Sequence, residues 1–166
     1  MKTRTQKIVV AALLAALVCV ATMIVKIPSP RGYINLGDSI VLLAGWMLSP
    51  LYGFLAAAIG SALADLLSGY GLYAPATFII KGIMALAAYF TFKMLKDKIK
   101  NIPSKIIGGI IAEVIMILGY FVFEGIYYGS FLTAAVNIPF NAIQGTVGLI
   151  AGIVLTKVFE KNKILM

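Results

Sequence analysis

The stretch that decides the fold is Ser39–Ala64, SIVLLAGWMLSPLYGFLAAAIGSALA, which carries no charged residue. A membrane-spanning helix needs about 20 apolar residues, so this stretch is too long for one ordinary span. Ser49-Pro50 falls in its middle, and the residue before a proline avoids the helical conformation. We therefore predict two helices here, a short one at 39–48 and a second at 51–67. The first is too short to span a membrane upright.

Further apolar segments have the length of a spanning helix, and they lie at 8–25, 75–95, 106–123 and 139–158. The composition agrees, because 61% hydrophobic and 12% charged residues are typical of a membrane protein. The first segment follows a basic start, as a signal peptide does, but it is long for one. Lys26-Ile27-Pro28 follows it in place of a small-residue cleavage site, so we interpret it as a retained helix. The prediction is an all-α membrane protein, a compact bundle of six transmembrane helices forming a single domain over 1–166.

The basic residues orient this bundle. They form three groups: Lys2, Arg4 and Lys7; Lys93, Lys96, Lys98, Lys100 and Lys105; Lys157, Lys161 and Lys163. Basic residues concentrate in cytoplasmic segments, and six helices place all three groups on that side. One continuous helix over 39–67 would put the largest group outside. Lys26 and Arg31, in the first outer connection, oppose this orientation. We therefore predict cytoplasmic N- and C-termini. Membrane topology also accounts for the net charge of +8, so we expect a lipid bilayer around the chain and no nucleic-acid partner.

Several chemistries are excluded or disfavoured by composition. The chain has no histidine and one cysteine, Cys19, which rules out disulfides within the chain, His/Cys metal sites and histidine-based triads. It has no G-x-x-x-x-G-K-[ST] motif, so it does not hydrolyse ATP through a P-loop. The enzyme alternative is an intramembrane aspartyl hydrolase built on Asp38 and Asp65. However, both residues are expected near the interface, and Leu36-Gly37-Asp38 matches known protease signatures poorly. We expect no enzyme, catalytic residue, metal or cofactor.

Ionisable side chains at the edges of or inside the apolar segments are the main functional signal, and they are Asp38, Asp65, Lys81, Glu113 and Glu124. Charge is costly in hydrocarbon and usually faces a bundle interior, a watery cavity or a binding site. Two predicted helix faces carry further polar groups: Asn137, Asn141 and Gln144 on one, and Glu113, Tyr120 and Glu124 on the other. Except for Glu113, which reaches mid-bilayer depth, these residues are predicted near the outer side.

This gathering favours a pocket open to the outside, walled by the helices at 75–95, 106–123 and 139–158. The outer connections at 26–38, 68–74 and 124–138 would cover it. Structural explanations remain open for single residues. Asp38 and Asp65 can cap helix ends, Lys81 can pair with either of them, and Asn137 can cap the last helix.

Small residues recur at spacings of four in the first helix, in the rows Ala11, Ala15, Cys19 and Ala12, Ala16. Such rows permit close approach of another helix. The approaching helix can belong to the same bundle or to another protein.

The chain resembles the substrate-binding S components of energy-coupling factor (ECF) transporters, the vitamin-uptake systems of prokaryotes. Four stretches carry the resemblance: Ala11-x-x-x-Ala15; Gly32-Tyr-Ile-Asn-Leu-Gly-Asp-Ser39; Gly60-Ser-Ala-Leu-Ala-Asp-Leu-Leu-Ser-Gly-Tyr70 with Tyr73-Ala-Pro-Ala-Thr-Phe-Ile-Ile-Lys-Gly82; and Asn137-Ile-Pro-Phe-Asn-Ala-Ile-Gln144. The second and third stretches look most like the branch for riboflavin or related heterocyclic vitamins.

The resemblance implies a role in the prokaryotic cell membrane. The chain would capture a water-soluble vitamin or precursor of the riboflavin, hydroxymethylpyrimidine or pyridoxine type at the outer face. The alanines of the first helix would contact a transmembrane coupling protein driven by two cytoplasmic ATPase subunits. The family's site regions fall on Asn35, Asp38, Asp65, Tyr73, Lys81, Asn141 and Gln144. With Tyr120, Glu124 and Asn137 from the polar faces above, these are the predicted substrate-binding residues.

A flat heterocycle needs an aromatic face and converging hydrogen bonds. Tyrosines expected near the outer side are Tyr70, Tyr73, Tyr120, Tyr127 and Tyr128, although an interfacial aromatic belt also explains such residues. The functional alternative is an autonomous secondary transporter or channel that uses Asp65, Lys81 and Glu113 as a proton relay.

Overall fold

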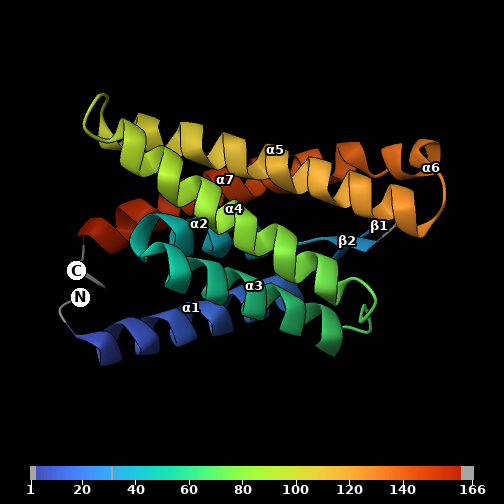
Figure 1. The fold of residues 1–166 in the computed structure, drawn as a ribbon, viewed down its shortest axis with the longest axis horizontal. Coiled ribbons are helices and arrows are strands. Elements are labelled where there is room, and N and C mark those ends of the chain that lie inside the picture. The colour runs from blue at the N-terminus through green and yellow to red at the C-terminus, as the bar shows by residue number, and fades with distance from the viewer. Residues whose placement is uncertain (1–2, 31, 162–166) are drawn as a thin grey trace.

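The chain folds into six main helices, a one-turn helix and a small hairpin in the computed structural model, which describes residues 3–30 and 32–161 (Figure 1). The helices are α1 (Arg4–Ile24), α2 (Gly37–Met47), α3 (Pro50–Leu67), α4 (Ala74–Leu95), α5 (Asn101–Tyr127), α6 (Phe131–Ala135) and α7 (Ile138–Lys161). Strands β1 (Ile27–Ser29) and β2 (Gly32–Ile34) pair antiparallel, with Pro28 opposite Tyr33. Lys2, Arg31 and Lys163 from the charge argument lie outside the described residues.

The predicted division at Ser49-Pro50 is confirmed. Ser49 is extended, with φ −70° and ψ 158°, and α3 begins at Pro50, where a missing N–H costs no helical hydrogen bond. Within the described residues, five helical segments are long and apolar enough to cross a membrane, and α2 is the shorter sixth main helix. Its 11 residues extend about 16 Å at 1.5 Å per residue.

The short helix α2 lies inside the bundle. Its first ten residues, Gly37 to Trp46, are all buried, and it packs against α1, α3, α4 and α7. Leu42 and Leu43 are fully enclosed, whereas large apolar side chains on other helices, such as Leu13 on α1, stay exposed as lipid-facing residues do. The helix that is too short to span is therefore a central core element.

Close helix contacts depend on small residues. At Gly60 of α3, a Cβ atom would lie 2.3 Å from the carbonyl oxygen of Ala15, so only glycine lets α1 and α3 approach this closely. Because lipid tails are as apolar as leucine side chains, such close packing is a main source of helix association in membranes.

The two ends of the bundle differ. The start of α1, the end of α7 and the α4–α5 connection lie at one end, and the hairpin, the α3–α4 connection and α6 lie at the other (Figure 1). The start of α1 and the end of α7 therefore share one side, as the predicted orientation requires (Figure 1). We call the end with the hairpin the hairpin end.

The structure corrects both ends of the helix predicted at 106–123, which begins earlier, at Asn101. The helix predicted to end at 123 continues to Tyr127, so Glu124 lies within its last turn, and Gly129 reverses the chain with φ 65°. The outer connections predicted as loops contain the hairpin and α6. Strands of three residues are too short to show a two-residue period, and α6 is a single turn capped by the Ser130 side chain.

Candidate functional site: a polar cavity at the hairpin end

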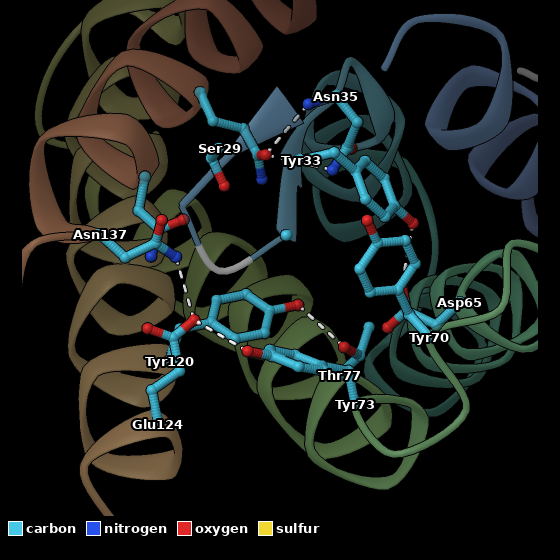
Figure 2. Close-up of a pocket in the computed structure, with 13 residues that line it drawn as sticks. Ser29, Tyr33, Asn35, Asp65, Tyr70, Tyr73, Thr77, Tyr120, Glu124 and Asn137 are labelled. Atoms are coloured by element: carbon cyan, nitrogen blue, oxygen red, sulfur yellow. Dashed lines mark hydrogen bonds between the residues drawn. The ribbon is translucent and has the colours of Figure 1, made fainter. Parts of the chain in front are cut away.

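A cavity of about 50 Å³ lies at the hairpin end, between the hairpin and helices α3, α4, α5 and α7. Its lining comprises Ser29, Gly32, Tyr33, Asn35, Asp65, Tyr70, Tyr73, Thr77, Tyr120, Glu124, Asn137, Asn141 and Gln144. The labelled side chains in Figure 2 surround this common space with hydroxyl, amide and carboxyl groups. Segments more than 100 residues apart in the chain therefore build one polar surface.

The structure brings together eight of the ten predicted substrate-binding residues. Those lining the cavity are Asn35, Asp65, Tyr73, Tyr120, Glu124, Asn137, Asn141 and Gln144. The other two, Asp38 and Lys81, are not part of the lining. They are 0% and 3% exposed and form an ion pair behind it, which is one of the structural alternatives left open by the sequence.

Sequence reasoning missed Ser29, Gly32, Tyr33 and Thr77 as lining residues. Thr77 lies four residues before Lys81 and thus on the same face of α4, which is a signal that was present in the sequence. Tyr33 stands within the Gly32–Ser39 stretch that carries the resemblance, but the hairpin that turns it toward Asp65 was not predicted.

An amide network forms the wall behind the hairpin. Oε1 of Gln144 accepts hydrogen bonds from the backbone N–H and Nδ2 of Asn35, at 3.0 and 3.1 Å. Oδ1 of Asn35 accepts one from the backbone N–H of Gly37 at 2.9 Å, at the start of α2. Nε2 of Gln144 donates to Oδ2 of Asp38 at 2.7 Å. The cavity wall is therefore connected to the start of the buried helix.

The ion pair extends this network into the core. Nζ of Lys81 donates to Oδ1 of Asp38, and it lies 5.5 Å from the ring centroid of Tyr120. That distance is within the range of a cation–π interaction. Glu113 is close by and 6% exposed, and neither of its carboxyl oxygens has a hydrogen-bond partner in the described part of the chain. The carboxyl group of Glu113 packs against Gly145 of α7. A Cβ atom added at Gly145 would lie 2.9 Å from Oε2 of Glu113.

A second pair of contacts ties the hairpin to α3. Oη of Tyr33 donates to Oδ1 of Asp65 at 2.9 Å, and its ring meets that of Tyr70 edge-on at 4.9 Å. Burial, followed by the negative charge of Asp65, raises the pKa of Tyr33 well above its usual value. The phenol therefore remains a hydrogen-bond donor throughout the physiological pH range.

The opposite wall is built by α5 and the start of α7. Nδ2 of Asn137 donates to Oε1 of Glu124 at 3.0 Å, and the hydroxyls of Thr77 and Tyr120 are 3.0 Å apart. Oδ1 of Asn137 is buried and accepts no hydrogen bond from the described residues, so this wall has an acceptor available to a ligand.

A wider hollow adjoins the cavity on the surface of the hairpin end. It measures about 600 Å³ and includes Tyr70, Tyr73, Tyr127 and Tyr128. Tyr70 and Tyr73 line both spaces and thus stand between them. The Tyr73 and Tyr128 hydroxyls lie 3.1 Å apart, within hydrogen-bond distance. This contact fixes the position of Tyr73 between the cavity and the hollow.

An apolar groove lies elsewhere, between α1 and α3, with a volume of about 650 Å³. Its α1 side contains all the small residues predicted to meet another helix: Ala11, Ala12, Ala15, Ala16 and Cys19. Its α3 side includes Tyr52, Ala56 and Ile59. We call this feature the alanine groove.

A membrane bundle with a polar cavity at one end and an apolar groove along its side has the architecture of a solute-binding membrane component. The chain belongs to the family of ECF-type riboflavin transporter S components, whose family model matches residues 2–161. It is also 34% identical over 148 residues to a Pyrococcus woesei protein described as "Uncharacterized protein in gap 3'region", covering 87% of this chain and 95% of that one.

A solved structure also matches the chain, and it too is of an ECF transporter S component. The structure described as "Structure and mechanism of the S component of a bacterial ECF transporter" matches with a TM-score of 0.77 and 28% identity, over 98% of this chain and 99% of that one. The comparisons confirm the predicted family, the six-helix fold and a multi-pass membrane location. They place the chain in a transporter family and not among enzymes.

Proposed function

We propose that the chain captures riboflavin, or a related heterocyclic vitamin, in the cavity at the hairpin end. The observation that carries this proposal is the convergence of amide and tyrosine side chains there. Amides offer both donors and acceptors, which suit the polar edge of a flavin or pyrimidine ring, and tyrosines suit its flat face.

The hairpin end faces outward in this proposal. Support comes from the opposite end, where the start of α1, the end of α7 and the lysine-rich α4–α5 connection lie together (Figure 1). Because basic connections remain in the cytoplasm, the cavity is then accessible to solute outside the cell.

A vitamin needs more room than the inner cavity offers, because small-molecule pockets measure about 300–1,000 Å³. The adjoining hollow supplies this room once Tyr70 and Tyr73 move aside. We therefore place the ring system across both spaces. Its polar edge then meets the residues at the start of α7, Asn137, Asn141 and Gln144.

The chain works with partners in this proposal. It holds no P-loop motif, so uphill uptake needs ATPase subunits and a transmembrane coupling protein. The alanine groove is the docking face for the coupling protein, because its small residues let a foreign helix approach closely.

Riboflavin binding to the purified chain tests the ligand, with quenching of flavin fluorescence as the measurement. Asn141→Ala removes an amide that faces the cavity and is expected to weaken binding about tenfold, or about 1.4 kcal/mol. The matched control is Asn101→Ala at the opposite end, where the amide donates to Glu160. Equal affinity in both variants would move the site elsewhere. Mass spectrometry of co-purifying small molecules would identify a different vitamin.

The proton-relay alternative receives less support from the contacts. Two of its three residues are engaged elsewhere, Lys81 by Asp38 and Asp65 by Tyr33. Glu113 is left without a hydrogen-bonded connection to either in the described chain. Transport in liposomes without partners would favour the alternative.

A further inference from the structure

The Lys81–Asp38 ion pair behind the cavity makes a further hydrogen bond that neutralising the two charges does not require. Asp38 uses its two carboxylate oxygens separately: Oδ1 accepts from Lys81, and Oδ2 accepts from Nε2 of Gln144 at 2.7 Å. A buried ion pair is costly to desolvate, and apolar residues of similar volume often give equal or greater stability. The pair therefore calls for an explanation other than stability.

The geometry around Gln144 suggests this explanation. The two ends of an amide are alike in size but opposite in hydrogen bonding. A carboxylate only accepts, so Asp38 requires the NH₂ end of Gln144 to face it. The carbonyl end then faces the donors of Asn35, and the orientation of the amide in the cavity wall is fixed.

Two further contacts hold this arrangement. Gly148 of α7 lies so close to α2 that a Cβ there would be 2.8 Å from Cβ of Asp38, which keeps Gln144 within reach. On the other side, Nζ of Lys81 lies over the ring of Tyr120, another lining residue. One buried pair thus supports a lining residue on α7 and another on α5.

We propose that Lys81 and Asp38 are positioning residues of the vitamin site, which orient Gln144 and Tyr120 for the ligand and do not touch it themselves. This inference rests on the proposed function, with riboflavin as the ligand. Loss of the pair lets the Gln144 amide rotate, so affinity falls even though no ligand contact has been removed.

A double-mutant cycle tests the proposal with the full chain in detergent and riboflavin as the probe. We expect Gln144→Ala alone, and Lys81→Met/Asp38→Ala alone, each to weaken binding about tenfold or more. The pair acts mainly through Gln144, and only its contact with Tyr120 remains once Gln144 is removed. Combining all three changes should therefore weaken binding by no more than about threefold beyond the worse of the two. A combined loss near the product of the two, about a hundredfold, means independent contacts and overturns the proposal.

A rescue variant separates positioning from simple destabilisation. Lys81→Met/Asp38→Asn carries no buried charge at the pair, and its new amide oxygen can still accept a hydrogen bond from Gln144. It should recover most of the affinity that Lys81→Met/Asp38→Ala loses, and the recovery should vanish when Gln144→Ala is added. Equal affinities of these two double variants, with Gln144 present, would overturn the proposal.

The control uses another ion pair, in which the lysine is buried and the carboxylate is partly exposed. Lys105 is 2% exposed and pairs with Glu160 near the opposite end of the bundle. Lys105→Met should lower the unfolding temperature while leaving riboflavin affinity within about twofold of wild type. If it weakens binding as much as the Lys81→Met/Asp38→Ala variant does, the effect is general and the proposal fails. Failure of the wild-type chain to bind riboflavin would instead overturn the proposed function, and this inference with it.

Discussion

The phenol of Tyr33 donates a 2.9 Å hydrogen bond to the carboxylate of Asp65, and this contact ties the β1–β2 hairpin to the end of α3. The two residues lie 32 positions apart and both line the cavity. Because the bond joins the cover of the cavity to its wall, it helps to determine how firmly the hairpin closes the site.

Tyr33→Phe should loosen this cover. The change removes one hydrogen bond to a carboxylate and keeps the ring that packs on Tyr70. We expect riboflavin to dissociate about three- to tenfold faster, in keeping with a bond worth about 1 kcal/mol or slightly more. Stopped-flow fluorescence measures the rate. Tyr89→Phe, on the half of α4 away from the cavity, is the control, and equal rates in the two variants would contradict the prediction.

Ala12→Trp should block assembly and spare ligand binding. Ala12 is exposed in the alanine groove, where an indole would fill the space proposed for a partner helix. Vitamin uptake by cells that carry the coupling protein and ATPases should fall at least about tenfold, while riboflavin affinity of the purified chain stays unchanged. Leu13→Trp, on the exposed face of α1 outside the groove, is the control. Normal uptake by the Ala12→Trp variant would exclude the groove as the docking face.

Glu113→Gln should be tolerated. The carboxyl group is buried without a hydrogen-bond partner in the described residues, and glutamine has the same shape without an ionisable group. Unfolding temperature and riboflavin affinity should match or slightly exceed those of wild type, and uptake should persist. The proton-relay alternative predicts the opposite, because a relay cannot work through an amide. Lost uptake with intact binding would therefore favour that alternative.

Asn137→Asp should destabilise the cavity wall in a pH-dependent way. The new carboxylate replaces an amide that donates to Glu124 at 3.0 Å, so two like charges meet in a buried site. We expect a loss of about 1–3 kcal/mol near pH 8. The loss should shrink as the pH falls, because one proton bound between the carboxylates removes the repulsion. Thermal unfolding at pH 8 and pH 5 measures it.

The control for this prediction is an amide–carboxylate contact at a more exposed position. Asn101 donates to Glu160 at 3.3 Å on the exposed end of the bundle. Asn101→Asp should therefore cost much less, because solvent screens the repulsion and Lys105, which pairs with Glu160, offsets it. A loss at Asn137 that grows toward low pH would contradict the electrostatic explanation.

The helices were predictable because local rules determine them. Pro50 fixes the start of α3, and the uncharged apolar run at 8–25 has the length of a span and lies almost entirely within α1. The hairpin was not predictable, since its pairing of Pro28 with Tyr33 involves strands too short to show a period. No local signal indicated that α5 continues through Glu124 to Tyr127 either.

The sequence indicated which residues gather at the site, but it did not indicate which of them line the cavity and which lie behind its wall. Helical spacing correctly grouped Asn137, Asn141 and Gln144 on one face, and they line the cavity. It could not tell whether Lys81 faces the cavity or the core, because its distance from Asp38 depends on how α2 and α4 pack. How deeply a side chain is buried in a helix bundle depends on tertiary packing, which residue spacing along the sequence does not determine.

The alanine groove has a consequence for the protein when it is alone in a bilayer. An apolar groove of about 650 Å³ does not stay empty in a membrane, so acyl chains fill it when the chain is alone. If the coupling protein docks here as proposed, docking is an exchange of lipid for protein, and its equilibrium depends on how well a given acyl chain conforms to the groove. Membrane composition would thereby regulate how readily the transporter assembles.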